Sequence, residues 1–136
     1  MQQTFEPIET EAGIIYGRDA IFLYSVHLGF HPRWVELTGE LNNQLCSKLK
    51  DQEKIITYRL KFSGVLAFMM TELDCRDFLG ESSFDLVINS DWINELQIRD
   101  SDSKLKPDHK HYIVFTYDEV FDIICQSYKM NLFEAS

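Results

Sequence analysis

The sequence predicts a single α+β domain, mainly an antiparallel sheet of about six to seven strands, sandwich-like or closed into a half-open barrel. Its 136 residues are the length of one ordinary domain. Residues 34–41 and 56–62 alternate apolar and polar side chains, which is typical of strands with one buried face. One or two short helices complete the prediction, including one at the C-terminus. Residues 1–12 are expected to form an N-terminal arm, and residues 13–136 a single globular domain.

The first part of the globular domain is predicted as strands. Residues 14–28 are rich in β-branched and aromatic side chains, so we expect two strands joined by a turn at residues 17–19. A helix over residues 19–28 is the alternative. The apolar positions of residues 34–41 also approach helical spacing, but Gly39 in the middle of the segment disfavours a helix.

The middle of the chain combines strands with a short helix. Residues 65–73 are apolar enough to be buried on both faces; we favour a strand, although nine residues do not separate a strand from a helix. A polar loop over residues 77–83 and a strand over residues 84–88 follow. Ser90 is a good N-cap for a helix over residues 91–97.

The C-terminal part is predicted as a strand and a helix. Residues 111–117 are strongly apolar, and the spacing of Thr116 and Glu119 matches a capping box. Polar residues then recur at helical intervals through residues 118–130, which favours a C-terminal helix. The alternative is a hairpin that turns at residues 118–119.

Charge argues against binding to nucleic acid. The chain holds 22 acidic and 13 basic residues, a net charge of −9, which repels phosphate backbones. A membrane partner is not expected either, because the longest apolar run, residues 65–70, is far too short to span a bilayer.

Several features bear on compartment and cofactor. The N-terminus lacks the basic start and apolar stretch of a secretory signal. Cys46, Cys75 and Cys125 are odd in number and widely spaced, which suits reduced thiols. We therefore expect a cytoplasmic protein. No cofactor is expected, because the six glycines follow neither the P-loop nor the dinucleotide-binding spacing.

His109 and His111 are the best metal candidates. Alternate side chains of a strand project to the same side, about 7 Å apart, and two imidazoles can bridge that distance. A site needs a third ligand, however, and Asp108 falls on the opposite side of an extended segment. We therefore expect a solvated pair of histidines and assign no metal ligands.

Acidic side chains concentrate in residues 72–102, which hold nine acids against two arginines, a net charge of −7. Such a surface attracts basic proteins. The expectation is a non-enzymatic, acidic protein-interaction domain, comparable to an immunity or inhibitor protein or to an adaptor, that engages a basic protein partner. Trp92 lies beside polar residues and is a candidate anchor, although burial is the commoner role of a tryptophan. The expected partner-binding residues are Glu72, Asp74, Asp77, Trp92, Asp100 and Asp102.

The alternative is a small hydrolase or ligand-binding protein that uses histidine and carboxylate side chains in a cleft. A pocket in which His109 or His111 lies within hydrogen-bond reach of a carboxylate or a cysteine would favour this alternative. Homodimerisation through an exposed edge strand is a third possibility. The sequence assigns no catalytic residue.

Overall fold

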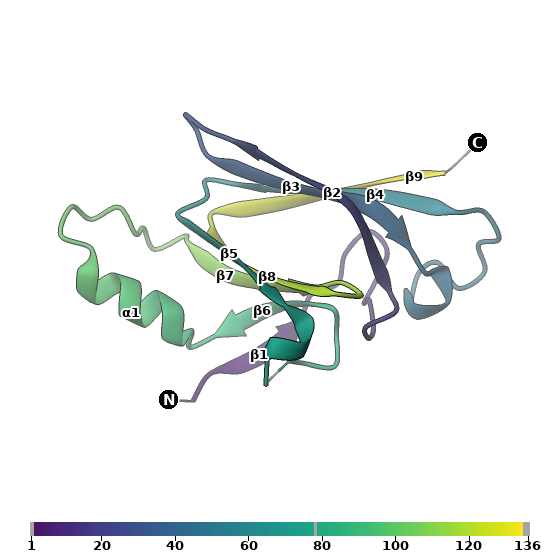
Figure 1. Cartoon of the computed structure of the whole chain (residues 1–136), viewed down its shortest axis with the longest axis horizontal. Helices are drawn as coiled ribbons and strands as arrows, with labels where there is room; N and C mark the ends of the chain where they lie inside the picture. The colour runs from purple at the N-terminus through teal and green to yellow at the C-terminus, as the bar shows by residue number, and fades with distance from the viewer. Residues whose placement is uncertain (1, 78, 135–136) are drawn as a thin grey trace.

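The computed structural model describes residues 2–77 and 79–134, which form two packed antiparallel sheets and one helix (Figure 1). The four-stranded sheet has the order β2 (Ile21–Gly29), β3 (Trp34–Leu41), β4 (Ile56–Ser63), β9 (Ser127–Glu134). The five-stranded sheet has the order β1 (Thr4–Pro7), β6 (Phe84–Ile88), β7 (Lys110–Phe115), β8 (Glu119–Cys125), β5 (Ala67–Glu72). The helix is α1 (Asp91–Arg99), and the 3-10 turns are η1 (Asn43–Leu45) and η2 (Leu73–Cys75).

The prediction of a mainly antiparallel fold is confirmed, with differences in detail. The described residues form nine strands in an open two-sheet arrangement, and neither sheet closes into a barrel. The alternating segments form β3 and β4, which pair in register from Trp34 opposite Ser63 to Leu41 opposite Ile56. Their apolar side chains are buried and their polar ones are not, as the alternation requires.

The core lies between the two sheets. Phe62 of β4, Phe84 of β6 and Phe121 of β8 are fully buried there, and the Phe62 and Phe84 rings meet edge to face with centroids 6.1 Å apart. A second apolar cluster, which includes Ile113 and Val120, lies on the outer face of the five-stranded sheet. β7 and β8 are therefore buried on both faces, which explains why their sequences lack alternation.

The N-terminal segments depart from the expectation. Residues 4–7 of the expected arm form β1, which pairs with β6 from Thr4 opposite Ile88 to Pro7 opposite Asp85. Residues 14–28 were expected to hold two strands, but only β2 forms, and Ile15 and Tyr16 make isolated bridges instead. The backbone turns at Gly17, whose φ of +85° interrupts an extended segment.

The prediction of a C-terminal helix is wrong. Residues 119–134 form β8 and β9, and the alternative hairpin turn at residues 118–119 is the one adopted. The capping-box contacts do form, but they close a turn: the Glu119 N–H donates to Thr116 Oγ1 at 3.0 Å, and Thr116 Oγ1 donates to Glu119 Oε1 at 2.6 Å. The helical pattern misled because Asp122, which was expected on a solvent face, is 1% exposed.

Other predictions are confirmed. Residues 65–73 contain the strand β5, and α1 begins after Ser90, whose Oγ accepts the Ile93 N–H at 3.0 Å. Residue 78 of the loop expected over residues 77–83 lies outside the described residues, as do residues 1, 135 and 136. Within the described part of the chain, no helix is long and apolar enough to cross a membrane.

Candidate protein-interaction surface

Two strands leave unpaired backbone edges on the same side of the sandwich. β2 pairs only with β3, and β5 pairs only with β8. Figure 1 shows both strands facing the viewer, one from each sheet. An apolar groove of about 140 Å³ joins them, lined by Leu28 and Phe30 next to β2 and by Leu66 and Phe68 next to β5. The gap between the two sheets is thus open to a partner along this side.

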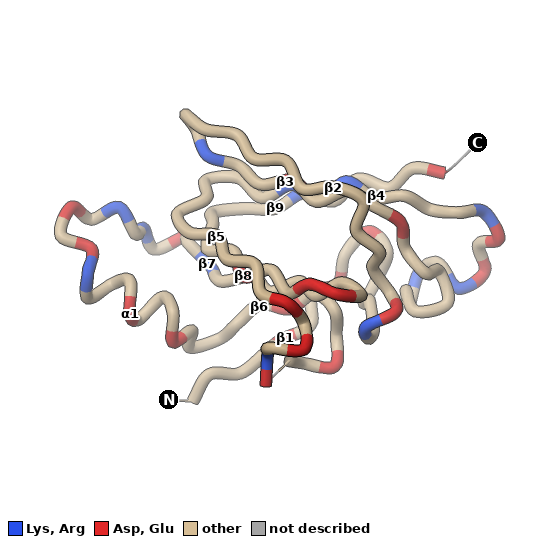
Figure 2. Tube along the Cα trace, viewed as in Figure 1, with Lys and Arg blue, Asp and Glu red and all other residues tan. Residues whose placement is uncertain are grey.

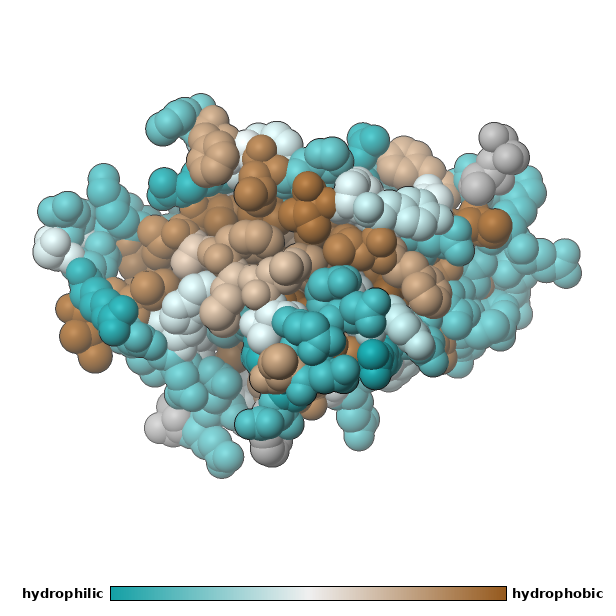
Figure 3. All heavy atoms as spheres, in the orientation of Figure 1, coloured by the Kyte–Doolittle hydropathy of each residue, from teal (hydrophilic) through white to brown (hydrophobic). Residues whose placement is uncertain are grey.

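Apolar side chains cover this side. Figure 3 shows them as a brown and tan band across the centre of the molecule. Large apolar residues are normally found singly on the surface of a monomeric protein, whereas a contiguous group marks an interaction site. We call this group the apolar edge surface; its members, with their exposed fractions, are Phe22 (36%), Tyr24 (64%), Leu28 (51%), Phe30 (67%) and Met70 (58%).

Four carboxylates gather at the end of this surface. Glu72 of β5 lies directly opposite Glu119 of β8, so two like charges face each other across the strand pair. Asp74 follows Glu72 in η2, and Asp118 precedes Glu119 in the turn from β7. Figure 2 shows red segments meeting at this end of β5. These four residues, Glu72, Asp74, Asp118 and Glu119, are called the acidic cluster below.

The acidic cluster has weak counter-charge. The Arg18 guanidinium lies 3.8 Å from an Asp74 oxygen and 3.7 Å from an Asp118 oxygen, and all three side chains are solvent exposed. Exposed pairs of this length contribute little. Arg18 also lies over the ring of Tyr117, which stacks on Phe22 with centroids 6.1 Å apart. The cluster is therefore continuous with the apolar edge surface.

The structure places the sequence-predicted partner residues in two groups. Glu72 and Asp74 belong to the acidic cluster, and Asp77 follows them as an exposed residue. Asp100 and Asp102 lie beyond the other end of α1, where Asp100 accepts the backbone N–H groups of Lys104 and Leu105 at 2.9 Å each. The acidic stretch of the sequence is therefore not one patch. Sequence reasoning missed Asp118 and Glu119, which only the hairpin brings to the cluster.

The predicted anchor Trp92 has a different neighbour. Its half-buried ring meets the ring of His111 edge to face, with centroids 5.6 Å apart. Asp85, another acid of the same stretch, is 2% exposed and cannot contribute to a surface. Burial raises the pKa of Asp85 to about 6, an effect that a hydrogen bond from Ser82 partly offsets.

A polar network lies under α1. His111 is 5% exposed; its Nε2 lies 2.7 Å from Asp122 Oδ1, and its Nδ1 lies 2.7 Å from Ser90 Oγ. Arg76 pairs with the other oxygen of Asp122. Burial alone raises the pKa of Asp122, but the hydrogen bonds from His111 and Arg76 and the charge of Arg76 outweigh it and leave the pKa below its usual value. The carboxylate of Asp122 is therefore a stable buried anion.

The metal candidates His109 and His111 are not brought together as ligands. His109 precedes β7, and its Nδ1 accepts the backbone N–H of Lys106 at 2.7 Å, while both nitrogens of His111 are taken up by Ser90 and Asp122. Over residues 2–77 and 79–134, no group of three or more His, Cys, Asp or Glu side chains has the arrangement of a metal site.

Comparisons of the chain with protein-family models, with curated proteins and with solved structures gave no match.

Proposed function

We propose that this protein is a non-enzymatic interaction domain of the immunity, inhibitor or adaptor type, and that a basic protein partner docks on the side formed by β2 and β5. The observation that carries the proposal is the continuity of the apolar edge surface with the acidic cluster through Phe22, Tyr117 and Arg18. The apolar residues supply contact area, and the carboxylates attract and orient a cationic partner.

A comparison of the sheet edges supports the choice of this side. Edge strands are usually protected by charged residues, proline or a bulge. β1 has only four residues and ends at Pro7, and β9 carries Lys129 and Glu134. β5, with the sequence Ala-Phe-Met-Met-Thr-Glu, has no Lys, Arg, Pro or Gly. Its free backbone groups are suited to the addition of an extended segment from a partner.

Charge identifies the partner as a basic protein. The net charge of −9 repels a second copy of the chain, and it also repels nucleic acid. A partner segment that alternates apolar and Lys or Arg side chains complements both the apolar edge surface and the acidic cluster. The three cysteines are free, as expected in a reducing compartment, and we infer a cytoplasmic location.

Charge reversal tests this proposal once a binding protein has been captured with the tagged chain and identified. We expect it to be basic and to bind more weakly in about 500 mM than in about 50 mM salt. Asp74→Lys with Asp118→Lys should weaken binding at least about tenfold. The control is Asp51→Lys with Glu53→Lys, which changes net charge equally on exposed residues of another loop and should change affinity less than about twofold.

Two results would reject the proposal. One is equal weakening by both charge reversals, which would mean that net charge alone attracts the partner. The other is a chain that captures only a second copy of itself. Circular dichroism of each variant establishes that the fold is retained.

A second candidate is a small hydrolase, because Ser90, His111 and Asp122 form a serine–histidine–carboxylate relay with both links at 2.7 Å. In this reading Ser90 Oγ attacks an acyl carbonyl and its proton passes to His111 Nδ1, while Asp122 stabilises the imidazolium. Burial favours a structural role instead, because Ser90 and His111 are each 5% exposed and Ser90 Oγ already caps α1.

A fluorophosphonate probe separates the two candidates. A hydrolase predicts covalent labelling of the native protein that is lost in Ser90→Ala, whereas the interaction domain predicts no labelling of the native protein. The Ser101→Ala variant, which changes an exposed serine after α1, is the matched control. Labelling that persists in Ser90→Ala would exclude this serine as the nucleophile.

A further inference from the structure

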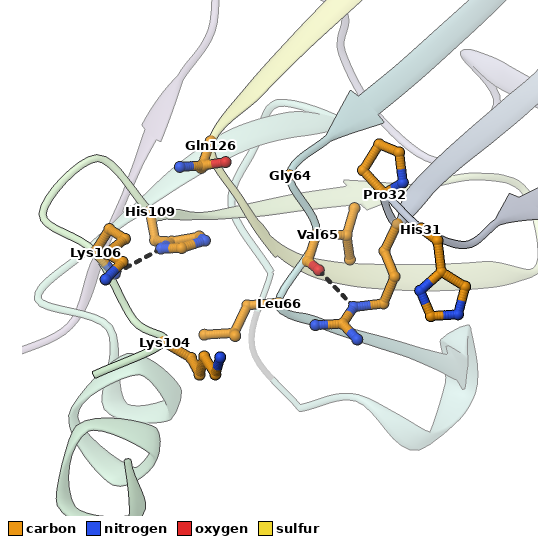
Figure 4. A pocket seen from close by; sticks show the side chains of 10 residues that line it. His31, Pro32, Gly64, Val65, Leu66, Lys104, Lys106, His109 and Gln126 are labelled. Atoms are coloured by element: carbon orange, nitrogen blue, oxygen red, sulfur yellow. Dashed lines mark hydrogen bonds between the residues drawn. The ribbon is translucent and has the colours of Figure 1, made fainter. Parts of the chain in front are cut away.

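The largest cavity described in the protein is basic, although the chain is acidic. It has a volume of about 390 Å³ and lies between the β2–β3 turn, the β4–β5 connection, the loop before β7 and the β8–β9 turn (Figure 4). Five of its ten lining residues carry a cationic or imidazole side chain, and none of the ten is acidic. These five define the basic pocket: His31, Arg33, Lys104, Lys106 and His109.

This concentration of positive charge is unusual for the chain. The basic pocket holds three of the 13 Lys and Arg residues and two of the four histidines. Arg33, Lys104 and Lys106 form no ion pair with any side chain in the described part of the chain. Their charges are therefore available to an external anion.

The nearest carboxylates are already occupied. Asp100 accepts the backbone N–H groups of Leu105 and Lys104, and these bonds lower its pKa. Asp108 accepts both of its hydrogen bonds from the amide of Gln126, at 3.2 and 3.3 Å. These contacts shape the loop before β7 but leave the lysine ammonium groups without a direct partner.

Two donors of the basic pocket are oriented by protein contacts. Arg33 Nε donates to the Val65 carbonyl at 3.0 Å, which fixes the guanidinium plane and leaves the two terminal nitrogens to bind a ligand. His109 Nδ1 accepts the Lys106 N–H, so the proton of the neutral ring sits on Nε2, a free donor. Figure 4 shows the His109 ring reaching from Lys106 toward the middle of the pocket.

The wall of the basic pocket depends on a glycine. Gly64 has a φ of +65°, and a Cβ at this position would lie 2.2 Å from Gln126 Oε1. Glycine therefore allows the connection from β4 to β5 to pass close to the β8–β9 turn, and it keeps this side of the cavity open.

We propose that the basic pocket binds the phosphate or carboxylate group of a small anionic molecule. The planar fork of Arg33 matches both oxyanions, the two lysines add point charges, and His109 Nε2 donates a hydrogen bond. The volume suits a small molecule. A nucleic acid is not favoured, because the remaining surface is acidic. This site is separate from the side formed by β2 and β5, so it stands whether or not the proposed function does.

Titration calorimetry with two probes tests the proposal. Inorganic pyrophosphate and citrate separate a phosphate-binding from a carboxylate-binding pocket, and saturable binding of either one supports it. We expect dissociation constants between about 10 µM and 1 mM. Lys104→Ala with Lys106→Ala should weaken binding at least about tenfold. The control is Lys50→Ala with Lys129→Ala, which removes the same charge from exposed positions and should change affinity less than about twofold.

Nuclear magnetic resonance gives a local readout of the same titration. Ring signals of His31 and His109 should shift saturably with pyrophosphate or citrate, whereas those of His27, exposed on β2, should stay. The proposal is overturned if neither probe saturates by about 10 mM. Equal weakening by both double variants, or equal shifts of all three histidines, would also overturn it by showing non-specific attraction. All four lysines are exposed, so these variants retain the core.

Discussion

Nε2 of His111 lies 2.7 Å from Oδ1 of Asp122, and both side chains are buried. The second nitrogen of the ring meets Ser90 at the start of α1, and Arg76 pairs with the second oxygen of Asp122. The network therefore joins α1, β7, β8 and the segment after η2. A buried charge is tolerated only when its hydrogen bonds are complete, and here each partner is present.

Replacing Asp122 by Asn should lower the free energy of unfolding by about 3 kcal/mol, because Arg76 and His111 lose their buried anion. Urea denaturation at pH 7 measures this loss. The control is Asp118→Asn, which removes an exposed carboxylate that pairs with Arg18 and should cost less than about 0.5 kcal/mol. Equal losses in the two variants would contradict a stabilising role for the network.

The same carboxylate makes stability depend on pH. The pKa of Asp122 is lower in the folded protein than in the unfolded chain, so its contribution is present above the unfolded value of 3.8 and is lost as pH falls through the folded value. We expect unfolding free energy to decline over this acidic range and to decline less steeply in Asp122→Asn. Parallel curves for the two proteins would show that Asp122 is not responsible.

Asp85 should have the opposite effect. Its pKa is raised to about 6 by burial, so the folded protein holds a proton that the unfolded chain releases near pH 3.8, and stability falls as pH rises between these values. Asp85→Asn should therefore be more stable than the native protein by about 1 kcal/mol at pH 8, with no gain below pH 4. Thermal unfolding at both pH values decides this, and a loss of stability at pH 8 would contradict it.

The three thiols should differ in reactivity. Cys75 is exposed, whereas Cys46 and Cys125 are buried. Burial raises the pKa of Cys46 to about 11 and that of Cys125 to about 12, although in Cys125 a hydrogen bond with the Ser127 backbone opposes the rise. A disulfide exchange reagent at pH 8 should modify one thiol quickly and the other two only on unfolding. Cys75→Ser should remove the fast phase, and a fast phase that survives would place an accessible thiol elsewhere.

The sequence predicted the elements whose local pattern matches their final environment. β3 and β4 have one buried face, so alternation identified them, and Ser90 identified the start of α1 because a helix cap is a local contact. The C-terminal helix was wrong because Asp122 is satisfied by Arg76, 46 residues away in the chain. No local pattern distinguishes a buried, paired aspartate from one on a helix surface.

The candidate site was predictable only in part. Glu72 and Asp74 were expected in the interaction surface, but their neighbours Asp118 and Glu119 join them through the β7–β8 hairpin. Whether a strand is an edge depends on sheet order, so the unpaired sides of β2 and β5 left no mark in the sequence. The basic pocket combines loops far apart in the chain, and its residues form no motif.

An edge-strand substitution complements charge reversal. Met70→Lys places a charge in the middle of β5 and should weaken partner binding at least about tenfold, because a charged edge resists strand addition. Ile98→Lys is the matched control, since Ile98 is 89% exposed on α1 and should tolerate the same change. An affinity that both variants share with the native protein would remove β5 from the interface.

Hydrogen exchange of the free and partner-bound protein tests the central claim most directly. The account predicts that amide protection rises in β2 (Ile21–Gly29) and β5 (Ala67–Glu72), with little change in β1 and β9. Protection confined to β1, β9 or the outer side of α1 would contradict it, because the partner would then bind away from the side where the apolar edge surface meets the acidic cluster.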